Sequence, residues 1–384
     1  MPQSVATVES VIGWRSRMTP TLLLLIVGGL CILGFMMLFS IGRAHHIEGT
    51  EFLRKQVLWT AIASVALWIT TCLRLEKLRS ASWIIGLASV GILALVLVPG
   101  VGLKINGARR WIDLGPMNMQ VSDFAKLGFL FFFAHYLASQ QRVLGSFFKG
   151  FLFPIGMIGL VCGLLFLQPD FGTAALFGVV GGILLFLAGC RLKFLIPSLF
   201  AAIALFSLLV LRDPIRLARI TSFLDLEGTR QTGGYQLWQA LLGFATGGPM
   251  GVGLGNSRQP LSFLPEAHTD FIFAVVGEEL GLIFTALTVL AFMAFFVIVL
   301  LQLRKAPQMF DFLLASGALL FIVLQALINV GVVTGLLPTK GMSLPFVSYG
   351  GSNLVAMGVL VGLILNLISE WNKDLAMEAG EITR

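Results

Sequence analysis

The chain has 384 residues, of which 57% are hydrophobic and 12% are charged. Because about a quarter of the residues of a soluble domain are charged, this composition excludes a soluble globular domain and predicts an integral membrane protein. The formal net charge of +7 does not indicate nucleic-acid binding, since the lysines and arginines of membrane proteins mostly flank the spans. The four cysteines lie in or beside different apolar segments without metal-ligand spacing, so we expect free thiols rather than a disulfide or a zinc site.

Apolar runs long enough to cross a bilayer recur along the chain. The first, from Leu22 to Ile41, is too long for the core of a signal peptide, so we expect a retained span. The sequence predicts an all-α membrane protein, a polytopic bundle of about ten transmembrane helices that forms a single integral membrane domain over residues 1–384. The predicted spans are 20–41, 56–73, 81–98, 121–138, 151–167, 172–190, 194–211, 271–302, 309–334 and 346–369.

An even number of spans places both ends of the chain on one side of the membrane. Lysines and arginines are nearly balanced between the two sides, but many on the far side lie in one long connection, residues 212–270. Long loops carry little weight in the positive-inside rule, whereas every short connection on the terminal side carries cations. We therefore expect cytoplasmic termini and a large extracytoplasmic loop at 212–270, between spans 7 and 8.

Two outer connections carry charged candidates for a site. The loop 99–120 contains Arg109 and Arg110. The turn 168–173 contains Asp170, which could cap the following span or pair with a cation.

Asp123 and Lys126, at the start of the fourth span, are spaced i, i+3 and can pair on one helix face. Such a pair at the edge of a span is commonly structural, and a functional role is the alternative.

The loop 212–270 is too long to be an idle connection. Its stretch 233–242 is amphipathic enough to lie at the membrane interface, and Tyr235 and Trp238 could stack on sugar rings or serve as interfacial anchors. Six glycines follow between positions 243 and 255. They predict close backbone packing or a re-entrant turn.

The stretch from Leu264 to Asp270 is polar and ends at the head of a long apolar helix. Thr269 or Asp270 is a plausible N-cap, which would place Asp270 at the positive end of the helix dipole. Glu278 and Glu279 follow about 12 Å further along the helix. Acids so close to lipid usually face a cavity or a partner, and a structural ion pair is the alternative. The polar loops on the outer face together supply cations and acids that could handle a phosphate-bearing substrate from lipid or line a transporter vestibule. The cations are Arg109, Arg110, Lys340 and Lys126, and the acids are Asp170, Glu266 and Asp270.

Four blocks of the sequence together resemble the SEDS family of peptidoglycan polymerases, and the resemblance covers nearly the whole chain. The blocks are Asn106–Pro116, Gln168–Ala174, Leu264–Gly281 and Leu336–Ser352. The segments Arg219–Asp225, Gly234–Leu237, Gly253–Ser257 and Leu337–Gly341 favour the cell-division branch, with the elongation and sporulation branches as alternatives.

The resemblance implies a glycosyltransferase that polymerises lipid II on the outer face of the cytoplasmic membrane. It also implies partners, namely a class B penicillin-binding protein transpeptidase and other divisome proteins. The acid that is essential in the family corresponds to Asp270. In the implied reaction a sugar hydroxyl attacks the anomeric carbon with inversion and undecaprenyl diphosphate leaves. A diphosphate needs no proton, so one carboxylate base suffices.

The leaving diphosphate requires positive charge, which a bidentate guanidinium supplies well. The candidate substrate-binding residues are Arg109, Arg110, Lys126, Lys340, Asp170, Glu266, His268 and Ser348. We expect Glu266 to orient the loop and His268 to make a loop hydrogen bond, with a proton shuttle at His268 as the alternative. A divalent cation, Mg or Mn, could share the charge, although no ligand cluster in the sequence indicates one.

The chain departs from the family pattern in three places. The stretch Gln120–Asp123 reads Gln-Val-Ser-Asp where the family has Gln-Pro-Ser-Glu, Gln168 replaces an acid, and Ser262 replaces a glutamate. A lipid II flippase and a non-catalytic scaffold are the competing functions. The near absence of charge within the spans between 20 and 98 and between 172 and 211 favours the enzyme, because a flippase needs charged groups near the membrane midplane.

Overall fold

The computed structural model describes residues 3–44, 49–105, 107–113, 115, 118–257 and 267–382. Within these residues, eight helices are long and apolar enough to cross a membrane, and α4 and α7 are shorter apolar helices. Each predicted span corresponds to one of these ten, so the all-α membrane bundle is confirmed. The ten helices are α1 (Gln3–Ala44), α2 (Gly49–Cys72), α4 (Ser82–Leu95), α5 (Val121–Ser139), α6 (Phe153–Leu167), α7 (Phe171–Leu187), α8 (Leu192–Leu211), α12 (Ile272–Leu303), α13 (Met309–Val333) and α14 (Gly351–Ile382).

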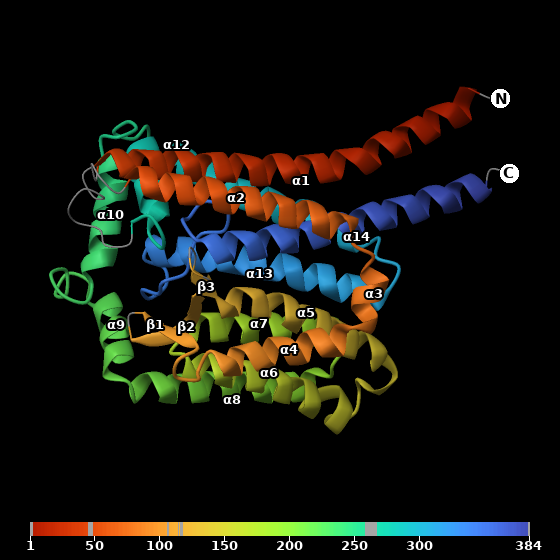
Figure 1. Ribbon diagram of the computed structural model, residues 1–384, viewed down its shortest axis with the longest axis horizontal. Coiled ribbons are helices and arrows are strands. Elements are labelled where there is room, and N and C mark those ends of the chain that lie inside the picture. The colour runs from red at the N-terminus through yellow and green to blue at the C-terminus, as the bar shows by residue number, and fades with distance from the viewer. Residues whose placement is uncertain are drawn as a thin grey trace.

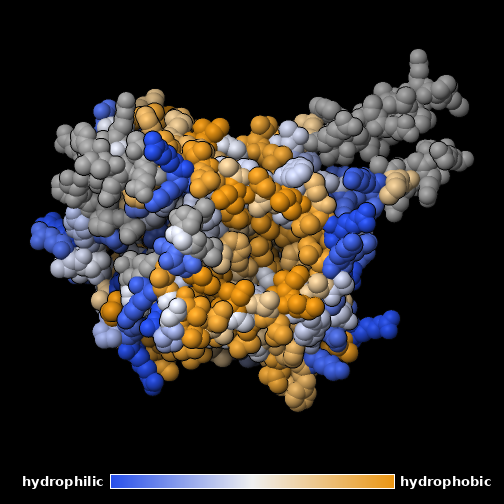
Figure 2. All heavy atoms as spheres, viewed as in Figure 1, coloured by the Kyte–Doolittle hydropathy of each residue, from blue (hydrophilic) through white to orange (hydrophobic). Residues whose placement is uncertain are grey.

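The centre of the bundle is formed by α5, α13 and α14. In the span of α14 89% of the residues are buried, against 6% in α8, so α14 is surrounded by protein while α8 presents nearly all of its side chains outward. The outward side chains are apolar, as expected for a helix that faces hydrocarbon. Figure 2 shows the resulting apolar band around the middle of the molecule, with hydrophilic residues at both ends.

Shorter elements connect the spans. They are α3 (Leu75–Ser80), η1 (Gln141–Val143), η2 (Phe148–Leu152), α9 (Pro214–Leu224), α10 (Tyr235–Gly247) and the strands β1 (Gly102–Ile105), β2 (Ala108–Asp113) and β3 (Asn118–Gln120). Figure 1 places α9, α10 and the strands at one end of the bundle, opposite the end at which the first turn of α1 and the last turn of α14 lie. The connections that contain α9, α10 and the strands therefore gather at one end, whereas α3 lies at the other.

The strands form an antiparallel sheet in the order β1-β2-β3, which pairs Ile112 with both Gly102 and Met119. The prediction of an irregular loop over 99–120 is therefore wrong, because much of this segment forms strands. The strands have only three to six residues, too short for a clear alternation. The pair Asn106-Gly107 is a hairpin signal in the sequence, and Gly107 has the positive φ of 81° that such a turn requires.

The glycine-rich segment after α10 packs directly on the backbone of α12. The N–H groups of Val252 and Gly253 donate to the carbonyls of Glu278 and Glu279, at 2.9 and 3.0 Å. A side chain at Gly251 would overlap the backbone at Glu279, so the predicted close packing is confirmed. Beside this contact α12 is interrupted at Gly281, whose φ is 74°.

Candidate active site

Asp170 joins three segments that are far apart in the sequence. It is the N-cap of α7, where its carboxylate accepts from the backbone N–H of Thr173. Lys340 Nζ donates to Asp170 Oδ1 at 3.1 Å, and Gln120 Nε2 donates to Oδ2 at 3.3 Å. Arg110 Nη1 lies 4.0 Å from Oδ2. The cap and the cation partner, which the sequence left as alternatives, are thus both present.

The charges of this cluster support one another. Burial by itself would raise the pKa of the Asp170 carboxyl, but Lys340, Arg110 and the Thr173 hydrogen bond hold that pKa below its usual range. Burial lowers the pKa of the Lys340 ammonium, and the charge of Asp170 opposes this effect. Asp170 is therefore ionised at neutral pH, and its negative charge helps to keep Lys340 protonated.

Gly172 makes room for Lys340 at the start of α7. A side chain at this position would overlap the end of the Lys340 side chain, at Cε and Nζ. The lysine therefore crosses the first turn of α7 to reach Asp170, and any larger residue at position 172 would displace it.

Asp270 lies next to the segment that carries Lys340. A side chain at Gly341 would overlap the Asp270 carboxylate, so the acid lies against the backbone immediately after the lysine. Asn329 of α13 fixes this arrangement, because its Nδ2 donates to the carbonyls of Asp270 and Met342 at 2.8 and 2.6 Å. The base predicted from the sequence and the predicted cation at Lys340 thus belong to one site.

The predicted capping role of Asp270 is wrong. The N-cap of α12 is Phe271, with no side-chain capping hydrogen bond. Residues 267–271 form turns before the helix begins at Ile272. The Asp270 carboxylate lies against the Gly341 backbone.

Arg109 and Arg110 lie side by side on β2. Alternate residues of a strand point to opposite faces, so the two guanidinium groups cannot both face Asp170. Arg110 is the one near Asp170, and its Nε is buried without a hydrogen-bond partner among the described residues. The Arg110 side chain as a whole is 29% exposed, so its guanidinium is suited to an incoming anion.

Lys126 lies further inside the bundle than the Asp170 cluster, in a buried polar network. Its Nζ donates to Asp123 Oδ1 at 3.0 Å, to Gln325 Oε1 at 2.9 Å and to Asn353 Oδ1 at 3.3 Å. The predicted i, i+3 pair is therefore confirmed, and all three donors of the ammonium are in use. The structure does not bring Lys126 together with Lys340 and Arg110 in the Asp170 cluster, and its bonds favour the structural alternative.

Of the departures from the family pattern, Asp123 belongs to this network and Gln168 lies outside it. Asp123 accepts from Ser352 Oγ at 2.8 Å through its second oxygen, so the shorter acid still has two partners. Gln168 is buried and donates to the carbonyl of Leu93 at 2.8 Å. Ser262 lies outside the described residues.

The remaining candidate residues, His268, Ser348 and Glu266, belong to the segments that precede α12 and α14. The ring of His268 contacts that of Phe52 in a tilted arrangement, with 4.7 Å between centroids, and the His268 carbonyl accepts from the N–H of Tyr349 at 2.9 Å. Ser348 accepts from the N–H of Leu344 at 2.8 Å, which closes a turn. Glu266 lies outside the described residues.

Glu279 is a fully buried acid close to the interruption in α12. Its Oε1 accepts from the hydroxyls of Ser40 in α1 and Ser257 in the glycine-rich segment, both at 2.5 Å. For Glu279 these described partners are hydroxyls on two other segments and not a cation. Glu279 therefore ties α1 and the glycine-rich segment to α12.

The interpretation of the sequence missed Gln325 and Asn329. They are spaced i, i+4 on α13, so they share a face, and that face is directed to the segment 334–350 and Asp270. Two polar amides in an otherwise apolar span are the signal that could have revealed them, because polar residues in spans are costly and usually functional.

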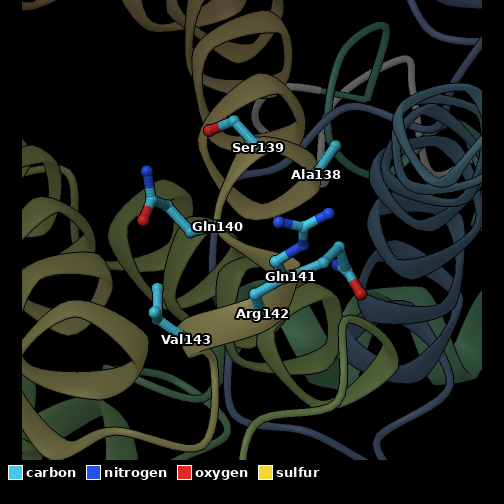
Figure 3. A pocket seen from close by; sticks show the side chains of 6 residues that line it. All are labelled: Ala138, Ser139, Gln140, Gln141, Arg142 and Val143. Carbon is cyan, nitrogen blue, oxygen red and sulfur yellow. The ribbon is translucent and has the colours of Figure 1, made fainter.

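Two other features of the described residues lie apart from this cluster. A hollow of about 420 Å³ lies at the C-terminal end of α5 (Figure 3), lined by residues 138–143, none of which is a predicted site residue. The four cysteines are free, as expected. No group of three or more His, Cys, Asp or Glu side chains that could hold a metal ion is present in the described ranges.

Comparison with known proteins identifies the family. The model of the family FtsW/RodA/SpoVE, described as "Cell cycle protein", matches residues 20–373. The probable peptidoglycan glycosyltransferase FtsW of Coxiella burnetii is 40% identical over 319 residues, 82% of this chain and 86% of the relative. That of Nitrosococcus halophilus is 42% identical over 320 residues, 81% and 82% of the two chains.

Solved structures agree with these relatives. A chain from a peptidoglycan synthase complex, studied for its coordination of polymerization and crosslinking, superimposes with a TM-score of 0.77 at 28% identity, covering 91% of this chain and 97% of that chain. The rod shape determining protein RodA of Thermus thermophilus gives a TM-score of 0.67 at 27% identity, covering 92% and 96%. The chain therefore belongs to the FtsW/RodA/SpoVE family of cell cycle proteins.

Proposed function

We propose that this chain is a peptidoglycan glycosyltransferase that polymerises lipid II into glycan strands for septal wall synthesis in cell division. The observation that carries the proposal is the position of Asp270 against Gly341, next to Lys340 and its ion-paired cluster with Asp170 and Arg110. A carboxylate beside a set of cations is the arrangement required for glycosyl transfer from a diphosphate. The names of the relatives support the same activity.

In the proposed reaction Asp270 acts as the general base. It takes the proton of the acceptor 4-hydroxyl as that oxygen bonds to the anomeric carbon of the donor. The bond from this carbon to the diphosphate oxygen breaks, and undecaprenyl diphosphate leaves with the electron pair. Attack opposite to the leaving group inverts the α-linked donor into a β-linked glycan.

The charge that develops on the diphosphate is stabilised by Arg110 and Lys340. The side chains of Arg110 and Lys340 are 29% and 23% exposed, so both are accessible to a ligand. Asp170 positions the two cations and keeps Lys340 protonated. Arg109, on the other face of β2, would contact phosphate or sugar further out.

Among the residues that the structure describes, the site forms no cluster of metal ligands of its own. The Asp170 oxygens already accept from nitrogen donors of Lys340, Gln120 and Thr173. A divalent cation would therefore take most of its ligands from the diphosphate itself.

We further propose an orientation and a partner for this integral membrane protein. Both termini would be cytoplasmic, and the active site and the loop 212–270 extracytoplasmic, because lipid II is polymerised outside the cytoplasmic membrane. The similarity to a chain of a synthase complex that coordinates polymerization and crosslinking supports a class B penicillin-binding protein as the partner.

The experiment that tests the function is a polymerisation assay. The purified protein and its transpeptidase partner are incubated with labelled lipid II, and the products are separated on a gel. Asp270→Asn is compared with the wild type. Asp225→Asn, which alters an exposed acid in the same large loop, is the matched control.

Polymer from the wild type and the control, but not from Asp270→Asn, is the expected result. Polymer from all three proteins would support the assignment as a glycosyltransferase and show that Asp270 is not its general base. If none of them makes polymer, although lipid II moves across vesicle membranes that contain the wild type, the chain is a flippase. Without either activity, cell division that survives Asp270→Asn would indicate a scaffold.

A further inference from the structure

A second hollow lies at the head of α10, at the end of the bundle where β1–β3 and α9 also lie (Figure 1). Its volume is about 330 Å³, and it is open to the surface. The residues that line it are Arg230, Gln231, Tyr235, Trp238 and Gln239. None of them belongs to the Asp170 cluster or to the Asp270 loop.

One face of α10 is buried against the bundle and the other is partly exposed. Leu237 and Ala240 are 2% and 0% exposed, and Leu237 also approaches Gly335 at the end of α13. Tyr235, Trp238 and Gln239 are spaced i, i+3, i+4, so they share the other face and are turned away from the bundle. Because one face of α10 is buried against the bundle, the helix is fixed in place. Tyr235 and Trp238 are therefore held one turn apart on its other face.

The polar groups in this hollow are available to a ligand. Within the described part of the chain, no side-chain hydrogen bond or ion pair engages the guanidinium of Arg230, the two amides, the phenol or the indole. They provide donors at every position and acceptors at the amides and the phenol.

The composition of the hollow selects the class of ligand. A prenyl chain requires an apolar groove, and a diphosphate requires several cations, whereas this hollow has one cation and four neutral hydrogen-bonding residues. Flat aromatic faces that also carry polar groups suit a ligand with an apolar ring face and a polar edge. Pyranose rings with hydroxyl and acetamido groups have this character, and Arg230 could pair with a carboxylate attached to them.

We propose that this hollow binds the glycan strand, a polymer of N-acetylated amino sugars, outside the reacting centre. The proposal rests on the proposed function, which supplies such a strand. A strand held here dissociates less often between additions, so the hollow would lengthen the products that the enzyme makes.

The binding step is tested on the full-length protein with tetra-N-acetylchitotetraose, a soluble β-linked oligomer of N-acetylglucosamine, by isothermal titration calorimetry. We expect Trp238→Leu to weaken binding about tenfold, which corresponds to about 1.4 kcal/mol at 25 °C, and Trp238→Phe to retain most of it. Gln239→Ala provides a second, smaller perturbation. Trp68→Leu, which removes a tryptophan that is 66% exposed on α2, is the matched control.

Product length provides the second measurement. We expect Trp238→Leu to yield strands several-fold shorter than those of the wild type and of Trp68→Leu, in protein that melts at the temperature of the wild type. A wild type that does not bind the tetrasaccharide, or a Trp238→Leu variant that binds it equally and makes strands of normal length, would overturn the proposal.

Failure of the proposed function has a different signature. Tetrasaccharide binding does not depend on turnover, so the Asp270→Asn variant should bind the probe like the wild type. Binding that Trp238→Leu abolishes, in a protein that makes no polymer under any condition, would refute the polymerase and still support a saccharide site.

Discussion

The substitution Gly172→Ala tests the role of Lys340 with a single added methyl group. The glycine lies in the first turn of α7, where its backbone has no unusual conformation, so alanine is compatible with the helix. Gly→Ala at a compatible position stabilises a protein by about 0.4–1 kcal/mol. The new Cβ would, however, overlap Cε and Nζ of Lys340.

The size of the effect follows from the distance that Lys340 must move. Carbon contacts are comfortable at about 3.5–4.0 Å, so the ammonium must retreat by roughly 1.5 Å. Directed away from Asp170, this retreat lengthens the ion pair from 3.1 Å to about 4.6 Å. With an effective dielectric constant of about 20, the attraction falls by about 2 kcal/mol. If the transition state depends on this ammonium, the rate falls roughly twentyfold to thirtyfold.

The assay is the initial rate of lipid II polymerisation, measured beside thermal unfolding in the same detergent. Gly182→Ala is the matched control, because it adds the same methyl group to the same helix in open space. We expect an unchanged or slightly higher melting temperature for Gly182→Ala. For Gly172→Ala we expect a slightly lower melting temperature, because the weakened ion pair outweighs the helix gain, and a lower rate in this variant alone. A Gly172→Ala enzyme as fast as Gly182→Ala would refute the role assigned to Lys340.

Three further predictions concern the same cluster. Asp170→Asn removes the negative charge that raises the pKa of Lys340, so the alkaline limb of the residual pH–rate profile should move to lower pH, and an unmoved limb would contradict the assignment. Asn329→Leu leaves two buried carbonyls without their donor and should lower the free energy of unfolding by roughly 2–5 kcal/mol in denaturation experiments; a smaller loss than 1 kcal/mol would mean that water replaces the amide. Gly341→Ala displaces the Asp270 carboxylate and should reduce kcat at least tenfold with a smaller change in KM, whereas a change in KM alone would place Asp270 in binding.

Features that depend on neighbouring residues were predictable from the sequence. The ten helices follow from apolar runs, because a bilayer permits little else across its hydrocarbon. The Asp123–Lys126 pair and the cap at Asp170 follow from short spacings and turn chemistry. The close packing of the glycine-rich segment followed from the number of its glycines.

Features that depend on contacts between distant segments were not predictable in this way. Lys340 and Asp170 are 170 positions apart, and a single sequence contains no spacing that brings them together. The cap at Asp270 was expected from a local pattern, but the Gly341 backbone and Asn329, both distant in the sequence, determine where this residue lies. The strands were missed because each is too short to show a period of its own.

The position of Asn329 shows how the Asp270 base and the Lys340 cation are fixed relative to each other. Its amide donates to the carbonyls of Asp270 and Met342, and Met342 follows Lys340 by two residues. One side chain on a central span thus fixes both the loop of the base and the segment of the ammonium. A central helix with 72% of its span buried moves little, so the separation of base and cation is set before substrate binds. Such preorganisation lets the charges act on the transition state without the cost of rearranging them.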